Sequence, residues 1–153
     1  MVQQAPALQL PDKTDTDAKQ LSPNVSFRWL HDGKTFETRI TSSTRADIDI
    51  YAEANIAALR MWDKSAKFYS LQDVSDKNVT ITPYFRSRLE EVAGVIKEVG
   101  LEGDSVIVLS NSITGRIVQV YGRIFARKAE PIHQHWVIGY DSGVEKLKEL
   151  VGT

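Results

Sequence analysis

The stretch over residues 67–89 constrains the fold of this chain more than any other part of its sequence. It opens with an apolar run that includes Phe68 and Leu71 and is typical of a β-strand. A short polar turn follows, and an amphipathic helix is predicted to begin at Thr82 and Pro83. A strand that leads into a helix through a short loop is the repeating unit of a parallel sheet, so this stretch predicts an α/β fold.

The helix after this turn has the clearest end signals in the sequence. Thr82 is placed to act as its N-cap, and Pro83 stands at the first helical position, where a missing N–H costs nothing. Apolar residues recur at alternating spacings of four and three from Phe85 to Val99. Gly100 then follows as a residue suited to the left-handed backbone that ends many helices. The pattern predicts one helix with a single buried face.

Strands and helices alternate on both sides of this unit. The other predicted elements are a hairpin over residues 25–40, a helix over 45–63, a strand over 105–109, a helix over 113–128, a strand over 133–138 and a helix over 141–151. Right-handed crossovers would place the connecting helices mostly on one face of a small mixed sheet.

The N-terminal residues 1–23 differ from the rest of the chain. They contain three prolines and no sustained apolar period, so we expect a disordered tail followed by a single domain over residues 24–153. This part also lacks an apolar run of signal-peptide length, and no segment approaches the length of a membrane-spanning helix. We therefore expect a cytoplasmic protein.

The composition excludes several kinds of site. Because the chain has no cysteine, it has no disulfide, no thiolate metal site and no cysteine nucleophile. A net charge of −1 gives no overall field that would attract nucleic acid, so we expect no nucleic-acid partner. No glycine-rich phosphate loop and no Ser-His-Asp pattern is present. His133 and His135 would share one strand face, but no third metal ligand stands at a diagnostic spacing. We expect no enzyme, cofactor or metal.

A basic stripe is predicted on the helix over residues 113–128. Arg116, Arg123 and Arg127 follow one another at spacings of seven and four, which places them on one helix face. Such a stripe could contact phosphate, acidic lipid headgroups or an acidic protein. The alternative, which the pattern favours more, is a solvated face opposite the apolar side of the helix.

One part of the sequence resembles a known family. The run Ser-Leu-Gln-Asp-Val-Ser over residues 70–75, the helix start at residues 79–83 and the Val-Ile-Val-Leu strand at residues 106–109 are similar to the STAS domain, and more narrowly to its SpoIIAA-like branch, which is related to anti-sigma-factor antagonists. The resemblance covers roughly residues 25–151. It implies a mixed sheet of four to five strands with helices mainly on one face, and signalling by protein binding.

The family also has a phosphorylation switch that this sequence departs from. In the antagonists proper, an Asp-Ser-Ser-Gly-type stretch opens the helix after the central strand, and its serine is phosphorylated. Here residues 80–84 read Thr-Ile-Thr-Pro-Tyr, with neither an Asp-Ser pair nor a glycine. We expect no phosphoserine switch of the usual kind.

We therefore expect a non-enzymatic regulatory module that acts by binding another protein. The expected contact surface is the loop before the best-marked helix together with the first turn of that helix, where Tyr84 and Arg86 would be anchors because both residue types are enriched in interface hot spots. The residues of this surface are Asp76, Asn78, Thr80, Thr82, Tyr84 and Arg86. The hairpin over residues 25–40 offers a sheet edge, so we also expect a homodimer.

The alternative function is a carrier of a small molecule or lipid. It requires an apolar cavity between sheet and helices, for which the candidate lining residues are Tyr51, Trp62, Phe85 and Phe125. The sequence is compatible with a filled core and with a hollow one. Peripheral contact with a membrane or lipid is the interpretation that the pattern favours less.

Overall fold

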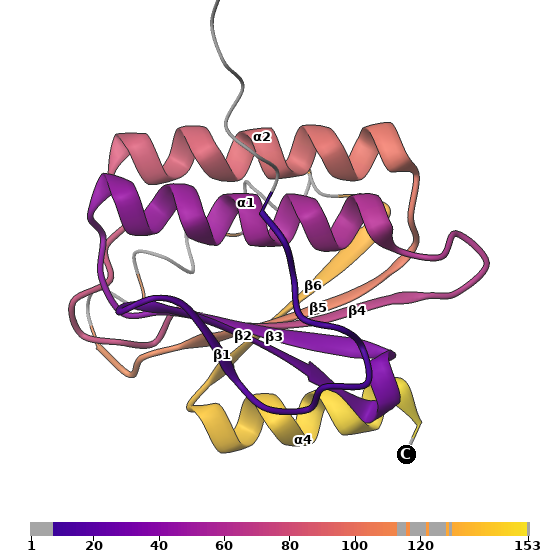
Figure 1. Cartoon of the computed structure of the whole chain (residues 1–153). Helices are drawn as coiled ribbons and strands as arrows, with labels where there is room; N and C mark the ends of the chain where they lie inside the picture. Colours follow the sequence, from indigo (N-terminus) through magenta and orange to yellow (C-terminus); the bar gives the residue numbers. More distant parts are fainter. Residues whose placement is uncertain (1–7, 113–115, 117–121, 123–127, 129, 153) are drawn as a thin grey trace, which may run out of the picture.

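The computed structural model describes residues 8–112, 116, 122, 128 and 130–152 (Figure 1). Its elements are β1 (Lys19–Ser22), β2 (Val25–Leu30), η1 (His31–Gly33), β3 (Thr35–Ile40), α1 (Arg45–Met61), β4 (Phe68–Asp73), α2 (Pro83–Val99), β5 (Gly103–Leu109), β6 (Ile132–Ile138) and α4 (Tyr140–Val151). The expected α/β class is confirmed.

The strands form one mixed sheet in the order β1-β2-β3-β4-β5-β6. The first two pairs are antiparallel, and the four strands from β3 to β6 run parallel to one another. The expectation of four to five strands was wrong, because the sheet has six. The additional strand is β1, which comes from the part of the chain that the sequence predicted to be a tail.

Within residues 8–22, Pro11 is buried and residues 19–22 form β1, so the expectation of disorder over residues 1–23 was wrong for this part. The indole N–H of Trp29 donates a hydrogen bond of 2.7 Å to the carbonyl of Pro11. The ammonium group of Lys13 lies 5.3 Å and 5.2 Å from the ring centroids of Trp29 and Trp62. The sequence did not reveal β1, because a short strand rich in polar residues shows little periodicity. The residues before it, Pro11 and Lys13, are held by aromatic side chains that come later in the sequence.

The strand β1 also changes the expectation about the hairpin edge. Its residues pair with β2 over Val25–Phe27, so β1 covers this part of the edge that was expected to be open for a homodimer. The three aromatic residues of the hairpin are fully buried in the core: Phe27, Trp29 and Phe36. A homodimer stays a prediction, but this stretch of β2 is not its interface.

The helices lie on both faces of the sheet (Figure 1). The crossover helices α1 and α2 cover one face side by side, as right-handed connections between parallel strands require. The helix α4 follows β6 and lies on the opposite face against β4 and β5. Among the residues described, no helix combines the length and the apolar character needed to cross a membrane.

The boundaries predicted for α2 are confirmed. The side-chain oxygen of Thr82 accepts a hydrogen bond of 3.1 Å from the backbone N–H of Phe85, and Pro83 is the first residue of the helix. The helix ends at Gly100, whose φ of +68° is the left-handed conformation that glycine adopts without strain. Phe85, Val92 and Ile96 of the predicted apolar face are buried on the side of α2 that faces the sheet.

Candidate functional site

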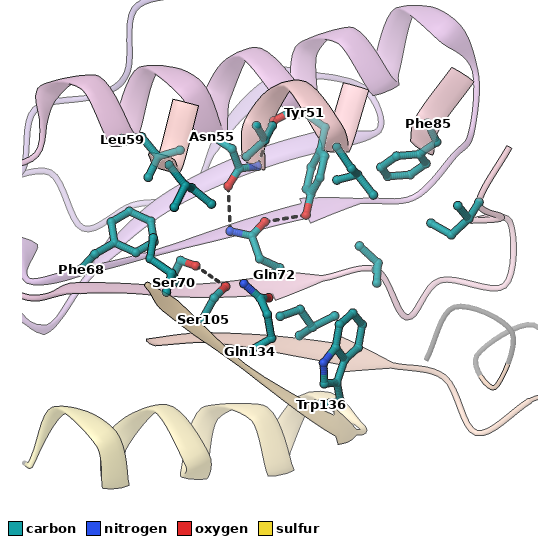
Figure 2. Close-up of a pocket in the computed structure, with 17 residues that line it drawn as sticks. Tyr51, Asn55, Leu59, Phe68, Ser70, Gln72, Phe85, Ser105, Gln134 and Trp136 are labelled. Carbon is teal, nitrogen blue, oxygen red and sulfur yellow. Dashed lines mark hydrogen bonds between the residues drawn. The ribbon is translucent and has the colours of Figure 1, made fainter. Parts of the chain in front are cut away.

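A cavity of about 90 Å³ lies between the sheet and the helices α1 and α2 (Figure 2). The strands β4, β5 and β6 form its floor, and the two helices contribute mainly apolar side chains, among them Leu59, Phe85 and Val92. The loop that connects β4 to α2 closes one end with Val74 and Ile81. A largely apolar cavity with a few polar groups is the usual form of a small-molecule site.

The polar groups of the floor come from three neighbouring strands. Ser70 on β4 stands opposite Ser105 on β5, and Ser105 stands opposite Gln134 on β6. Because side chains alternate across a strand, residues that share such a row point to the same face. The row therefore brings two hydroxyl groups and one carboxamide to the face of the sheet that α1 and α2 cover (Figure 2).

A second polar group, Gln72, is part of a buried network. Its Oε1 accepts hydrogen bonds of 2.5 Å from the hydroxyls of Thr38 and Tyr51, and its Nε2 donates one of 2.7 Å to Asn55 (Figure 2). Burial raises the pKa of Tyr51, so this hydroxyl stays protonated and acts as a donor. The network ties α1 to β3 and β4 and fixes one wall of the cavity.

Gln134 differs from the other polar groups of the floor. Ser70 and Ser105 bind each other through their hydroxyls at 2.7 Å. No hydrogen bond joins the Gln134 carboxamide to any residue in the described part of the chain, and Figure 2 shows it extending from β6 toward the helices. An amide usually finds partners when it lies in an apolar environment, so this group has donor and acceptor capacity left for a ligand.

The lining offers binding groups and no charged group. None of the described lining residues is Asp, Glu, Lys, Arg or His. Elsewhere in the described ranges, no cluster of three His, Asp or Glu side chains could hold a metal ion. His135 pairs with Asp104 at 2.7 Å, and His133 lies exposed. The lining residues could therefore bind a neutral molecule by apolar contact and hydrogen bonds.

The residues predicted to bind a partner lie on the loop between β4 and α2 and on the first turn of α2. Asn78, Thr80 and Arg86 are exposed, whereas Asp76, Thr82 and Tyr84 are half-buried. The loop is held by the segment between β3 and α1, because the backbone N–H of Thr80 donates a hydrogen bond of 2.7 Å to the side chain of Ser43. The same loop thus presents polar groups outward and the apolar residues of the cavity wall inward.

Tyr84 was expected to be exposed, and the structure shows it half-buried, while its role as an anchor for a partner stays a prediction. Its hydroxyl donates a hydrogen bond to the carboxylate of Asp49, and this bond is the first cause of the raised pKa of Tyr84. The guanidinium group of Arg45 lies 4.3 Å from the ring centroid. The ring is therefore part of the contact between α1 and α2, a role that its helical position alone does not distinguish from exposure.

The predicted cavity and the predicted basic stripe are recovered only in part. Tyr51 and Phe85 line the cavity, but Trp62 does not. The ring of Trp62 instead packs on Phe68, with centroids 4.8 Å apart. Phe125 of the cavity prediction, together with Arg123 and Arg127 of the basic stripe, lies outside the described residues, and Arg116 is exposed.

Sequence reasoning missed the polar floor. Its members are Ser70, Gln72, Ser105 and Gln134. One sequence signal could have revealed them: a polar residue on a strand whose neighbours two positions away, on the same face of the strand, are apolar. No family model matches the chain, and no curated protein or solved structure shows significant similarity to it. The resemblance to STAS domains therefore enters only the proposal below.

Proposed function

We propose that this chain is a cytoplasmic, non-enzymatic, STAS-like regulatory module that binds a small molecule in the cavity between the sheet and α1 and α2. The observation that carries the proposal is the carboxamide of Gln134, which makes no hydrogen bond to a described residue, whereas the other polar side chains of the cavity floor bind one another or their neighbours. Because Gln134 is half-buried, its carboxamide can exchange water for a ligand, whereas buried polar groups such as Ser70 and Ser105 are already satisfied. A ligand would complete the hydrogen bonds that the protein leaves open.

The volume of the cavity favours a small molecule over a lipid as the ligand. A cavity of about 90 Å³ is smaller than the roughly 150 Å³ that holds one benzene molecule. An acyl chain needs several times this space. The carrier function considered from the sequence is therefore proposed for small molecules and not for lipids.

The experiment is a thermal-shift screen of small compounds on three proteins. In Ile107→Phe, the added ring fills part of the cavity, because Ile107 lines it. In Ile138→Phe, the same change is made at a site that is 49% exposed and outside the cavity. We expect some compounds to raise the melting temperature of the wild type and of Ile138→Phe but not that of Ile107→Phe. Compounds that shift all three proteins equally, or none at all, would count against the cavity as a site.

A second candidate function is protein binding by the loop between β4 and α2. The observation that favours it is the anchoring of this loop: besides the bond to Thr80, the side chain of Ser43 donates a hydrogen bond of 3.0 Å to the Thr80 carbonyl. A loop that is held in one conformation loses little entropy when it binds a partner. Because the loop also contributes to the cavity wall, a ligand inside could alter what a partner meets outside.

Substitutions that add negative charge to the loop test this second candidate. Asn78→Glu combined with Arg86→Glu changes the exposed side of the loop and helix start, and Lys64→Glu changes an exposed residue in the turn after α1. Chemical cross-linking in the native cells should yield a partner with the wild type and with Lys64→Glu, and lose it with the double variant. A partner retained by the double variant would place the interface elsewhere.

A further inference from the structure

We propose that the cavity takes a neutral molecule of about four non-hydrogen atoms whose one hydrogen-bonding group is held by the carboxamide of Gln134. This inference rests on the proposed function and adds to it the size, charge and orientation of the ligand. Each of these three properties follows from a different feature of the cavity.

The size follows from the volume. Benzene has six carbon atoms and fits a cavity of roughly 150 Å³, so a cavity of about 90 Å³ corresponds to about four non-hydrogen atoms at the same packing. The walls leave little room for expansion on the α1 side, because the buried network around Gln72 fixes Tyr51 and Asn55. A ligand that extended toward α1 would have to break that network.

The absence of charge in the ligand follows from the lining. No charged side chain is present among the lining residues that the structure describes. A carboxylate or an ammonium group would lose its hydration on entering and would meet no opposite charge in return. A neutral molecule loses far less hydration, and its apolar part gains contact with Phe85 and Val92.

The orientation follows from which polar groups are already used. Oε1 of Gln72 accepts two hydrogen bonds, and Ser70 and Ser105 bind each other. The carboxamide of Gln134 makes no hydrogen bond to the residues that the structure describes, and Gln134 stands opposite Ser105 in the register of β5 and β6. The polar end of the ligand therefore lies at Gln134, and its apolar end points toward the side chains of α1 and α2 that line the cavity.

The test uses three probes of the same branched four-atom shape: acetamide, acetate and 2-methylpropane. They are titrated at neutral pH into the ¹⁵N-labelled full chain, and the backbone amide shifts of the cavity strands report binding. The variants are Gln134→Leu and Gln134→Met, which remove the carboxamide in two shapes. Gln20→Leu is the control, because Gln20 is an exposed glutamine of β1.

We expect acetamide to bind at least tenfold more tightly than acetate. Both Gln134 variants should lower the affinity for acetamide at least tenfold and change the affinity for 2-methylpropane by less than twofold. Gln20→Leu should change neither affinity. Equal binding of acetate and acetamide would overturn the inference, as would unchanged acetamide binding in both Gln134 variants. If none of the three probes binds although larger compounds from the screen do, the size class is wrong and the proposed function stands. If no compound binds at all, both fail.

Discussion

The hydroxyl of Tyr51 donates a hydrogen bond of 2.5 Å to Oε1 of Gln72, and this bond joins α1 to the strand β4 under it. Tyr51→Phe removes the donor and leaves Gln72 with one remaining donor on that oxygen, from Thr38. We expect the free energy of unfolding to fall by about 1 kcal/mol, the usual net contribution of a buried hydrogen bond. Urea denaturation measures this change.

Tyr69→Phe is the matched control for this substitution. Tyr69 lies on the same strand, and its hydroxyl makes no hydrogen bond to any residue that the structure describes. We expect its variant to unfold within about 0.5 kcal/mol of the wild type. Equal losses in both variants would mean that the Tyr51 bond adds nothing to stability.

The side chain of Thr82 caps α2, and we expect it to have no regulatory role. Thr82→Ala should cost about 1 kcal/mol of stability, because the N–H of Phe85 loses its partner. Thr82→Asp should cost almost nothing, because Asp caps equally well and its charge suits the helix N-terminus. Urea denaturation of both variants gives the comparison. Phosphate found at Thr82 in protein from its native cells would contradict this assignment.

Asp47 gives the fold a dependence on acid. Burial acts to raise its pKa, but hydrogen bonds from four side chains outweigh burial and lower it: those of Ser42, Ser22, Thr44 and Asn24. A carboxyl group whose pKa is lower in the folded state stabilises the fold above its unfolded pKa, and this contribution is lost as the pH falls through the folded pKa. We expect the stability of the wild type to drop below about pH 4.

Asp47→Asn tests this dependence. It should cost about 2 kcal/mol near pH 7, because hydrogen bonds to a charged group are replaced by weaker ones, and it should flatten the loss of stability in acid. Asp17→Asn, at an exposed carboxylate, should leave the profile unchanged. Chemical denaturation between pH 2.5 and pH 7 measures both profiles (the range brackets the ordinary carboxyl pKa of about 4). A profile for Asp47→Asn that parallels the wild type would place the acid sensitivity elsewhere.

Gly122 leaves room for the indole of Trp136, which lines the cavity. A Cβ atom at Gly122 would lie 2.0 Å from Cη2 of Trp136, far inside contact distance. Gly122→Ala should therefore destabilise the protein by about 1–3 kcal/mol, and adding the shorter ring of Trp136→Phe should restore part of the loss. Thermal unfolding of the two single variants and the double variant measures the coupling.

Gly94→Ala is the control for the glycine substitution, because Gly94 is a helical residue of α2 with nothing within 4 Å of its added Cβ. It should be neutral or stabilise by up to about 1 kcal/mol, since alanine favours a helix more than glycine does. A loss at Gly94 as large as that at Gly122 would show that backbone effects, and not the indole, cause the destabilisation.

The sequence predicted the elements whose pattern is local. The cap at Thr82, the stop at Gly100 and the apolar spacing between them place α2 correctly because each signal acts within one or two helical turns. The strand β1 was missed because its position depends on pairing with β2, which polar residues of a short strand do not announce.

The candidate site was harder to predict than the fold because it depends on register between strands. Ser70, Ser105 and Gln134 are distant in sequence and form one row only through the pairing of β4, β5 and β6. Tyr84 illustrates the opposite case, since a residue that suits an interface is used for contact between two helices. Neither fact follows from a single sequence, because both depend on which elements lie next to each other.

The most direct test of the cavity is a crystal structure of the full chain pressurised with xenon. Xenon enters apolar cavities that are hollow and large enough, and its electron density locates them. We expect one strong xenon site in contact with Phe85, Ile107 and Trp136, next to the Gln134 carboxamide. A pressurised crystal in which side chains fill this volume and no xenon is bound would contradict the claim that this fold contains a ligand site.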